Sequence, residues 1–552
     1  MKIRSWLALL ALPLLFYSRY FPFYLLFLLP FPWVKKKGGY LFLFLAFSSV
    51  ALLPVTADPS QAIFFLASAI FIFLLFSGLN PEEPIKFINL IVFALALNAI
   101  LEGIIGGGRA FTVLKDPNLA AVIMASSLPV TSPLVSVLSL IGIAFTRSRT
   151  GLLLAVLALV FILKRKHRMV LLLLILLLVL VPNPLSNYLR NMGKDPFAFS
   201  RMKIWQKSMD IYKDHPLGVG ALNYVSWADA YRIEVQGFPA RYFKKAIQAH
   251  NLYLQFLVEL GPFAVIFIIF LLGYVLKTRG RRRGVFLLLL LGAFFHSFEL
   301  NPVFWLPFAV LSERKGKIEY KRELLAVGFA VLFVIFTVFF TGRYFGKRAE
   351  HFSHELKFKK AEKSLSLALK LAPYEPEVHL SASKVYIRLF DIFKDRDDIG
   401  RAILEAKKAQ ALSRRNSEAL ILEIRAFMRA GEVYGLSPGD IAYLEKLYEK
   451  TKSLDPKNVL FMLEFAEFEA SMENKDKAVS ILKEILYIEP NFLRARWDLY
   501  KLTGDVSQLC FIKKHLGEYR RWKAHPYIYG ILYFPEEMIK GNNLPSCPEA
   551  EE

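Results

Sequence analysis

Long apolar runs dominate the first 342 residues of the chain, and a charged, amphipathic pattern follows them. A hydrocarbon core about 30 Å thick requires a long apolar helix to cross it. Lipid offers the backbone no hydrogen-bond partners, so each run predicts a helix. The runs fall at about 4–18, 20–34, 39–56, 61–78, 87–106, 115–129, 133–147, 150–164, 168–184, 250–276, 284–297, 301–312 and 323–341. Several are short, so we expect an all-α polytopic membrane bundle of about 12–13 spans.

Residues 343–552 predict a second, water-soluble domain built from helical hairpins. Helix endings recur at Leu371-Ala372-Pro373, Leu454-Asp455-Pro456 and Ile488-Glu489-Pro490, and the last two prolines are 34 residues apart. This period, with its terminal proline, resembles tetratricopeptide repeats. Such arrays present a concave surface, so a protein partner is expected there. An irregular helical bundle is the alternative.

The N-terminus begins Met1-Lys-Ile-Arg and continues into an apolar run, which is superficially like a signal peptide. It has no small-residue cleavage pattern, and a second apolar run follows Ser18-Arg19. We therefore expect a retained first transmembrane helix.

Basic clusters beside the apolar runs predict the orientation of the bundle. With the N-terminus inside, alternation puts four basic segments on the cytoplasmic side: Lys35–Lys37, Lys164–Arg168, Lys277–Arg283 and Ser312–Arg322. Positive loops favour that side, so the assignment is self-consistent. We thus expect a multi-pass protein of the cytoplasmic (inner) membrane. Its loop at about 185–249 and residues 343–552 are then extracytoplasmic, or periplasmic.

The composition agrees with a membrane part followed by a water-soluble tail. The chain of 552 residues is 55% hydrophobic, contains 49 Phe and carries a formal charge of +23. Because much of that charge lies next to the membrane runs, it orients helices and does not predict nucleic-acid binding. Cys510 and Cys547 are too few for a disulfide framework, and their spacing fits no zinc site. They can pair if the tail is extracytoplasmic.

The large loop at 185–249 is basic although it is predicted to lie outside. It holds ten basic residues, Arg190, Lys194, Arg201, Lys203, Lys207, Lys213, Arg232, Arg241, Lys244 and Lys245. It holds five acidic ones, Asp195, Asp210, Asp214, Asp229 and Glu234. Such a surface favours an anionic ligand. A merely solvated basic loop is the alternative.

A turn of small residues and arginines, Thr146-Arg-Ser-Arg-Thr-Gly151, separates two apolar runs. Arginines beside a membrane are often interfacial anchors. Arg147 and Arg149 in one tight turn also suit a phosphate, because each guanidinium offers a planar fork of donors.

A second segment follows in the large loop. Arg201 and Trp205 are four residues apart and share a helix face. The stretch His215-Pro-Leu-Gly-Val-Gly220 then breaks the helix, and its glycines allow backbone amides to approach a ligand. His215 itself is expected to be a turn residue, because proline follows it.

A third segment starts at His250, where a long membrane helix is expected to begin. Asn251, Gln255 and Glu259 recur every four residues and form a polar stripe on an apolar helix. Polar groups in such a place usually face a cavity or a site. An interfacial capping role is the alternative for His250.

Together these segments resemble the O-antigen ligase and polymerase superfamily. The resemblance rests on Ser148-Arg149-Thr150-Gly151, Arg201…Trp205…His215-Pro-Leu-Gly-Val-Gly220 and His250-Asn251-x9-Gly261, in the family's order. It covers residues 110–312 in detail. The ligase pattern has a second glycine after Gly261, where this chain has Ala264, and this favours polymerases or protein-glycosylating relatives.

The resemblance implies a GT-C-like, metal-independent glycosyltransferase. Such an enzyme moves a glycan from a polyprenyl diphosphate-linked donor, held next to membrane lipid, to a hydroxyl of a glycolipid, glycan or protein acceptor. No Asp-x-Asp motif or carboxylate cluster offers a convincing metal site, and no cofactor is expected. Cations must then stabilise the leaving diphosphate. The candidates are Arg147, Arg149, Arg201 and Arg241.

His250 is the candidate base, since a histidine can take the proton of the acceptor hydroxyl near neutral pH. Supporting roles fall to Trp205, Gly218, Gly220, Asn251, Gln255 and Glu259. The leading hypothesis is a ligase; a polymerase and a protein O-oligosaccharyltransferase are close alternatives. A lipid or polysaccharide transporter with a repeat scaffold is the non-enzymatic alternative. Transporters often show internal repeats, whereas here the polar features gather around one loop.

Overall fold

The structure, a computed structural model, describes most of the chain. The described residues are 34–36, 39–78, 83–107, 109–112, 114–163, 196–235, 238–242, 245–298, 301–317, 322–523, 525–540, 544–545 and 547. Two predicted spans, 4–18 and 168–184, lie outside these residues, and so does all of 20–34 except Val34.

Helices form almost all of the described structure, which confirms the all-α prediction. The exception among the described residues is a two-stranded antiparallel ribbon of β1 (Val34–Lys36) and β2 (Arg314–Lys317). This ribbon joins two basic segments that the charge pattern placed on the same side of the membrane.

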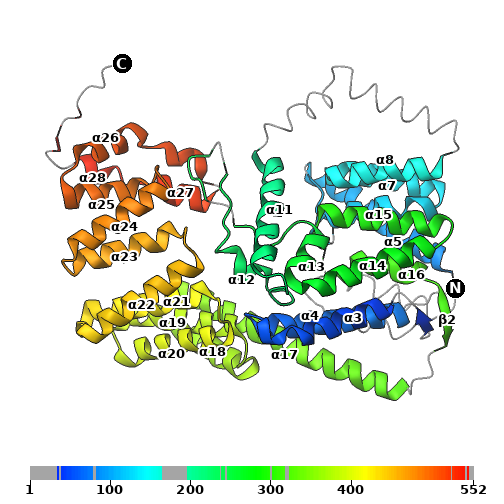
Figure 1. The fold of residues 1–552 in the computed structure, drawn as a ribbon, viewed down its shortest axis with the longest axis horizontal. Coiled ribbons are helices and arrows are strands. Elements are labelled where there is room, and N and C mark those ends of the chain that lie inside the picture. The colour runs from blue at the N-terminus through cyan, green and yellow to red at the C-terminus, as the bar shows by residue number, and fades with distance from the viewer. Residues whose placement is uncertain are drawn as a thin grey trace.

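The described residues of the apolar half form thirteen α-helices, most of which are labelled in Figure 1. They are α3 (Tyr40–Ala51), α4 (Pro59–Gly78), α5 (Pro84–Gly106), α6 (Pro117–Ser127), α7 (Pro133–Thr146), α8 (Arg149–Ile162), α11 (Pro196–Asp214), α12 (Tyr224–Ala228), α13 (Leu252–Leu260), α14 (Pro262–Lys277), α15 (Arg281–Phe295), α16 (Pro302–Leu311) and α17 (Arg322–His354). Many begin with proline, which suits the first turn because its missing N–H has no helical partner there.

Two of the described helices, α4 and α5, are long and apolar enough to cross a membrane by length and composition. They match the predicted spans 61–78 and 87–106. Five shorter apolar helices accompany them: Tyr40–Ala51, Pro117–Val130, Pro133–Thr146, Arg149–Ile162 and Pro262–Lys277. The structure therefore supports apolar helices at these places and leaves the number of spans as a prediction.

The prediction of a single long helix at 250–276 is wrong, because the structure has two helices there, α13 and α14. The break is at Gly261, whose φ of 56° and ψ of −129° are not helical. Pro262, at the start of α14, has no N–H to continue the hydrogen bonding of α13. The polar stripe thus belongs to a helix of nine residues, α13, and not to a full span.

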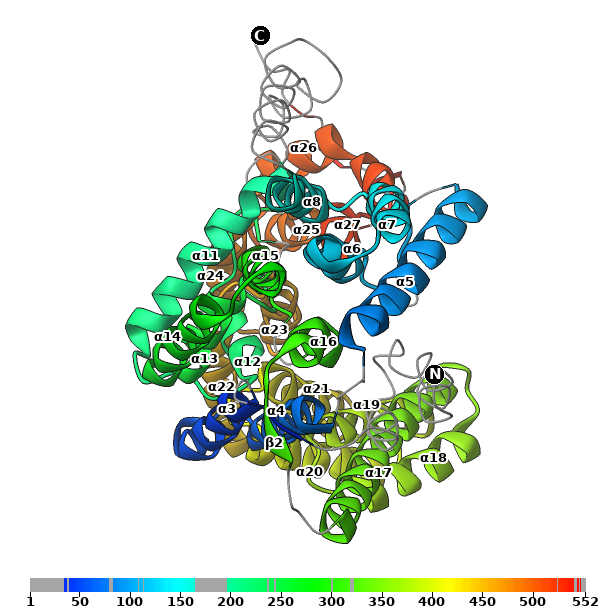
Figure 2. The same cartoon turned by 90° about the vertical axis from the view of Figure 1, so that its right-hand side faces the viewer.

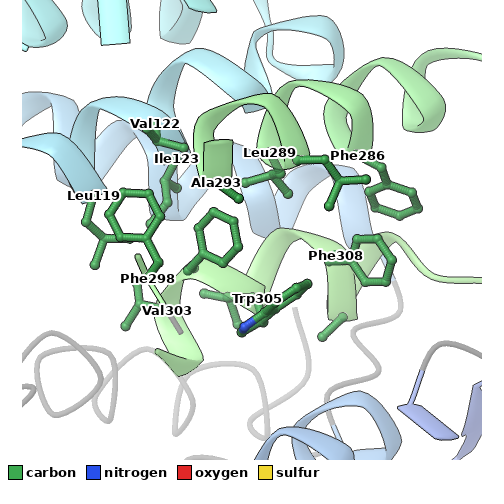
Figure 3. Packing of buried hydrophobic residues seen from close by; sticks show 14 of the residues in the cluster. Leu119, Val122, Ile123, Phe286, Leu289, Ala293, Phe298, Val303, Trp305 and Phe308 are labelled. Carbon is green, nitrogen blue, oxygen red and sulfur yellow. The ribbon is translucent and has the colours of Figure 1, made fainter. Parts of the chain in front are cut away.

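Aromatic side chains fill the core of the apolar half. The ring of Trp305 in α16 lies 4.9 Å from that of Phe42 in α3 and 5.0 Å from that of Phe304. In Figure 3, side chains of α6, α15 and α16 meet in this core, with Val122 and Leu289 among them. These contacts hold α15 against α6, the helix that supports the arginine turn.

Helix α17 connects the two halves of the molecule. It is a single helix of 33 residues, so the predicted boundary at 342/343 falls inside it. Phe340 packs on Phe64 of α4 with ring centroids 6.0 Å apart, and further along Arg343 binds Glu375 of the tail. The described structure therefore has a continuous helix, not a flexible linker, at this boundary.

The tail consists of short helices, each packed against neighbours in sequence (Figures 1 and 2). They are α18 (Phe358–Leu371), α19 (Pro376–Phe393), α20 (Arg396–Leu412), α21 (Ser417–Tyr434), α22 (Pro438–Leu454), α23 (Val459–Ser471), α24 (Lys475–Ile488), α25 (Leu493–Thr503), α26 (Val506–His515), α27 (Pro526–Leu532) and α28 (Glu537–Lys540). Helices α18, α22 and α24 end where the sequence predicted, directly before the recurring prolines. Their identity as tetratricopeptide repeats stays a prediction.

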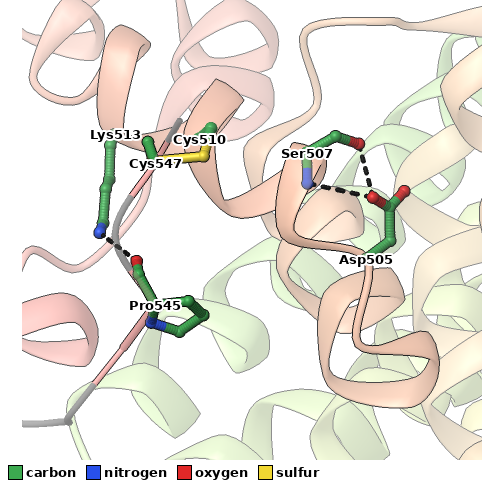
Figure 4. Close-up of a disulfide and its surroundings, with 6 residues drawn as sticks. All are labelled: Asp505, Ser507, Cys510, Lys513, Pro545 and Cys547. Atoms are coloured by element: carbon green, nitrogen blue, oxygen red, sulfur yellow. Dashed lines mark hydrogen bonds between the residues drawn. A yellow bond between two sulfur atoms is a disulfide. The ribbon is translucent and has the colours of Figure 1, made fainter. Parts of the chain in front are cut away.

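The two cysteines form a disulfide at the end of the tail. Cys510 in α26 is bonded to Cys547, with their Cα atoms 5.5 Å apart (Figure 4). Nearby, Lys513 donates to the carbonyl oxygen of Pro545 at 3.1 Å. The bond and this contact hold the last described residues against α26.

Candidate functional site

The arginine turn lies between α7 and α8. Arg147 ends α7 in the left-handed conformation, with a φ of 50°. Ser148 caps α8, since its hydroxyl accepts from the amide of Gly151 at 3.2 Å and donates to Asn118 Oδ1 at 3.0 Å. Arg147 and Arg149 are both exposed. Local capping thus positions the turn and leaves these two guanidiniums at the surface.

Arg109, which the sequence patterns did not single out, supports the same turn. Its Nε donates to the carbonyl oxygen of Thr146 at 2.8 Å, and its Nη2 donates to Asn118 Oδ1 at 3.2 Å. A guanidinium with several donors can bridge two acceptors in this way. Arg109 therefore adds a positive charge to the site and holds the end of α7.

Arg201 and Trp205 occupy one face of α11, as their spacing predicted. The pKa of Arg201 is lowered, first by burial and then by the positive charge of Arg149. The two arginines of the first and second segments therefore lie within electrostatic reach. Trp205 packs on Phe294 of α15, with ring centroids 5.2 Å apart. Its buried indole Nε1 has no hydrogen-bond acceptor among the described residues.

His296, in the connection between α15 and α16, joins the three segments. Its Nε2 lies 3.1 Å from Thr150 Oγ1, next to Arg149 in the chain. The ring of His296 is buried, and Ser297 beside it accepts from the amide of Asn251, which follows His250. The turn that carries Arg149 and the start of α13 therefore both bind the connection that contains His296.

His250 stands at the entrance to α13, with a φ of 50°. The next residue, Asn251, caps the helix, because its Oδ1 accepts from the amides of Tyr253 at 3.0 Å and Leu254 at 3.1 Å. The amide of Asn251 donates to Ser297 Oγ at 2.9 Å. The start of α13 is therefore bonded to the connection after α15. His250 precedes Asn251 and His296 precedes Ser297, so each histidine is next to one partner of this bond.

Gln255 and Glu259 are buried, and their side chains bind other parts of this chain. Gln255 Oε1 accepts from the amide of Ala249 at 2.7 Å, and its Nε2 donates to Glu259 Oε1 at 2.6 Å. Glu259 Oε2 accepts from the amide of Leu222 at 3.0 Å. The polar stripe therefore fixes the residue before His250 and the turn after α11.

Three glycines allow the turn after α11 to approach α13. The φ angles of Gly218, Gly220 and Gly261 are 94°, 93° and 56°. A Cβ at Gly218 would lie 2.7 Å from the carbonyl oxygen of Glu259, and one at Gly220 would lie 2.2 Å from Thr56 Oγ1. The amides of Val219 and Gly220 donate to carbonyl oxygens of α13. The expected amide donors are therefore used within the fold.

The structure places Arg241 against the tail. Its amide donates to Glu489 Oε2 at 2.6 Å, and its charge acts on the Glu489 carboxyl. His215 lies in the turn after α11, where its carbonyl oxygen accepts from the amide of Gly218.

Within the described residues, no group of three or more His, Cys, Asp or Glu side chains is arranged to hold a metal ion. The chemistry of the described site is instead that of several arginines and two histidines. Such a set can bind an anion and can move a proton.

Comparison with known proteins supports this interpretation. Residues 134–269 match the O-antigen ligase family model. The match covers the arginine turn, α11, the glycine turn, His250 and α13, while His296 lies beyond it. This similarity over about a quarter of the chain suggests a glycosyltransferase-type activity of the ligase or polymerase kind. No curated protein matches the chain.

The closeness of Gly261 to the glycine turn gives a prediction. A Cβ at Gly261 would lie 2.5 Å from the carbonyl oxygen of Leu217, and the positive φ disfavours alanine as well. Gly261→Ala should lower the free energy of unfolding by about 2 kcal/mol or more, as measured by thermal unfolding in detergent. Gly273→Ala is the matched control, because Gly273 in α14 has nothing within 4 Å of its Cβ position. Equal stability of the two variants would contradict the close approach.

Proposed function

We propose that this protein is a metal-independent glycosyltransferase of the O-antigen ligase or polymerase type. It transfers a glycan from a polyprenyl diphosphate to an acceptor hydroxyl at the outer face of the cytoplasmic membrane. The observation that carries the proposal is the arrangement of Arg149, Arg201, His250 and His296. The neighbours of Arg149 and His250 in the chain both bond to the segment of His296, and the charge of Arg149 acts on Arg201. These residues lie within or next to the part of the chain that matches the O-antigen ligase family.

The arginines suit the diphosphate of the donor. A guanidinium keeps its charge and binds phosphate oxygens through parallel N–H groups. Arg147 and Arg149 are exposed between the apolar helices α7 and α8, where a lipid-linked group can reach them. Arg201 adds charge from α11, and Arg109 adds charge where it bonds to Thr146. Arg241 serves this role less well, since the tail binds its backbone.

His250 suits the acceptor side of the reaction. It takes the proton as the acceptor O–H bond breaks, while the acceptor oxygen bonds to the anomeric carbon of the donor sugar. The bond from that carbon to the diphosphate oxygen breaks, and the electron pair leaves with the diphosphate. The arginines stabilise the negative charge that develops there. His296 supports Thr150 in the arginine turn.

The closest alternative functions differ in the acceptor. A ligase, a polymerase and a protein O-oligosaccharyltransferase share the donor chemistry and differ in the hydroxyl they use. Ala264, where the ligase pattern has glycine, favours the last two. It is fully buried in α14. A transporter would carry the donor across the membrane and leave it unaltered, so mass spectrometry of the products separates all four.

A reconstituted transfer assay with a lipid-linked donor tests the proposed roles. His250→Ala should lower kcat by about 100-fold or more, because the acceptor proton loses its base. Arg149→Ala and Arg201→Ala should weaken donor use by about tenfold or more. The matched control is His351→Ala, since His351 is 67% exposed on α17 and lies in the tail half of that helix.

Each outcome of this assay has a defined meaning. Full activity of His250→Ala at normal expression would remove its role as the base. A change in acceptor use alone in the arginine variants would mean that they do not bind the diphosphate. Unaltered donor recovered on the other side of the bilayer would favour transport.

The outward position of the tail is a separate prediction. Disulfides persist in oxidising compartments, and the bond between Cys510 and Cys547 favours such a compartment for the tail. A reporter enzyme that is active only outside the cytoplasm, fused after Glu552, should therefore be active. A reporter active only in the cytoplasm should be inactive at the same position, and the opposite pattern would reverse the orientation.

A further inference from the structure

The loop between α12 and α13 crosses the surface of the tail. Arg232 of this loop binds Asp455, which directly follows α22, through two parallel hydrogen bonds of 2.8 and 2.6 Å. The two side chains are only 10% and 2% exposed. A buried, bidentate pair of this kind is geometrically specific, since each partner would be costly to leave alone.

A second anchor lies further along the loop, next to α24. Glu489 accepts from two successive amides, those of Arg241 at 2.6 Å and Tyr242 at 2.7 Å. Asn491 Nδ2 donates to the carbonyl oxygen of Pro239 at 2.7 Å. Ala240 is fully buried in the apolar core of the tail. The loop backbone is therefore bound by the tail, independently of the Arg232 pair.

A third set of contacts flanks these anchors. Asp229 binds Lys245 at 2.5 Å within the loop and accepts from Ser417 Oγ of α21 at 3.2 Å. The guanidinium of Arg415 lies 3.5 Å from the ring centre of Trp227 in α12. The tail thus contacts the connection between α12 and α13 from its beginning to Tyr242, and the pair of Asp229 and Lys245 ties a later part of the loop to its beginning.

The bound loop also packs on α11, beside Arg201. Lys203 Nζ of α11 donates to the carbonyl oxygen of Glu234 at 2.8 Å. Ile204 of α11 packs with Ile233 and Ala246 of the loop in one buried cluster. Lys203 and Ile204 follow Arg201 closely in the helix, and Ala246 precedes His250 by four residues. The loop is therefore in contact with both candidate functional elements.

We propose that the tail is an intramolecular clamp that positions Arg201 and His250 by binding the loop between α12 and α13. Arg232, Asp455 and Glu489 are then positioning residues, and the face of the tail that carries the two acids is occupied by this chain itself. The effect on turnover rests on the proposed function, whereas the ordering of the loop does not.

Hydrogen exchange of the full-length protein in nanodiscs tests the clamp without any substrate. Arg232→Gln and Glu489→Gln weaken two separate anchors. In both variants, amides of α11 and of residues 245–254 should exchange about tenfold faster or more, because local opening becomes easier. The matched control is Arg425→Gln, which removes a bidentate pair with Glu464 inside the tail, at 2.7 and 2.7 Å.

The transfer assay then reads the functional consequence. Turnover should fall about tenfold or more in the two anchor variants, since a small displacement of reacting groups is costly, and it should not fall in Arg425→Gln. Unchanged exchange in both anchor variants would overturn the clamp. Faster exchange with full turnover would overturn its positioning role. A parent protein that transfers no glycan would refute the proposed function alone, because the exchange data still decide whether the tail orders the loop.

Discussion

A single buried carboxylate ties together the parts from which the candidate site is built. Glu259 is fully buried, and it accepts hydrogen bonds from the amide of Leu222 and from Gln255 Nε2. Gln255 in turn accepts from the amide of Ala249. A buried acceptor left without partners costs on the order of 1–3 kcal/mol, so these bonds strongly favour one arrangement. The turn after α11, the start of α13 and His250 between them are consequently held as one unit.

The second constraint on the candidate site is the concentration of positive charge around the arginine turn. Arg149 lowers the pKa of Arg201, and Arg109 is bonded to the same turn as Arg149. Neighbouring positive charges repel one another, and an anion bound among them lowers the free energy of the site. In the proposed function that anion is the diphosphate of the donor, and the fold holds the charges in place before it arrives, which is the condition for electrostatic catalysis without reorganisation.

Local sequence patterns predicted many of the helices, because apolar periodicity indicates where a helix runs, and proline and glycine indicate where it begins or ends. The endings before Pro373, Pro456 and Pro490, and the shared face of Arg201 and Trp205, are features of this kind. The break at Gly261 could have been predicted from the proline that follows it. His296 and Arg109 carry no local motif. The packing of α15 against α6 and α8 brings His296 to the arginine turn, and the packing of α5 against α7 brings Arg109 there. The bonds from Arg232 to Asp455 join residues far apart in sequence, which one sequence cannot reveal.

Helix α17 gives the two halves a mechanical relation. At about 1.5 Å per residue, its 33 residues span about 50 Å, which is longer than a hydrocarbon core of about 30 Å. A continuous helix transmits orientation, unlike a flexible linker rich in glycine and serine. The tail therefore keeps a fixed heading relative to α4, on which Phe340 of α17 packs. A turn of the tail would have to bend α17 or break that packing.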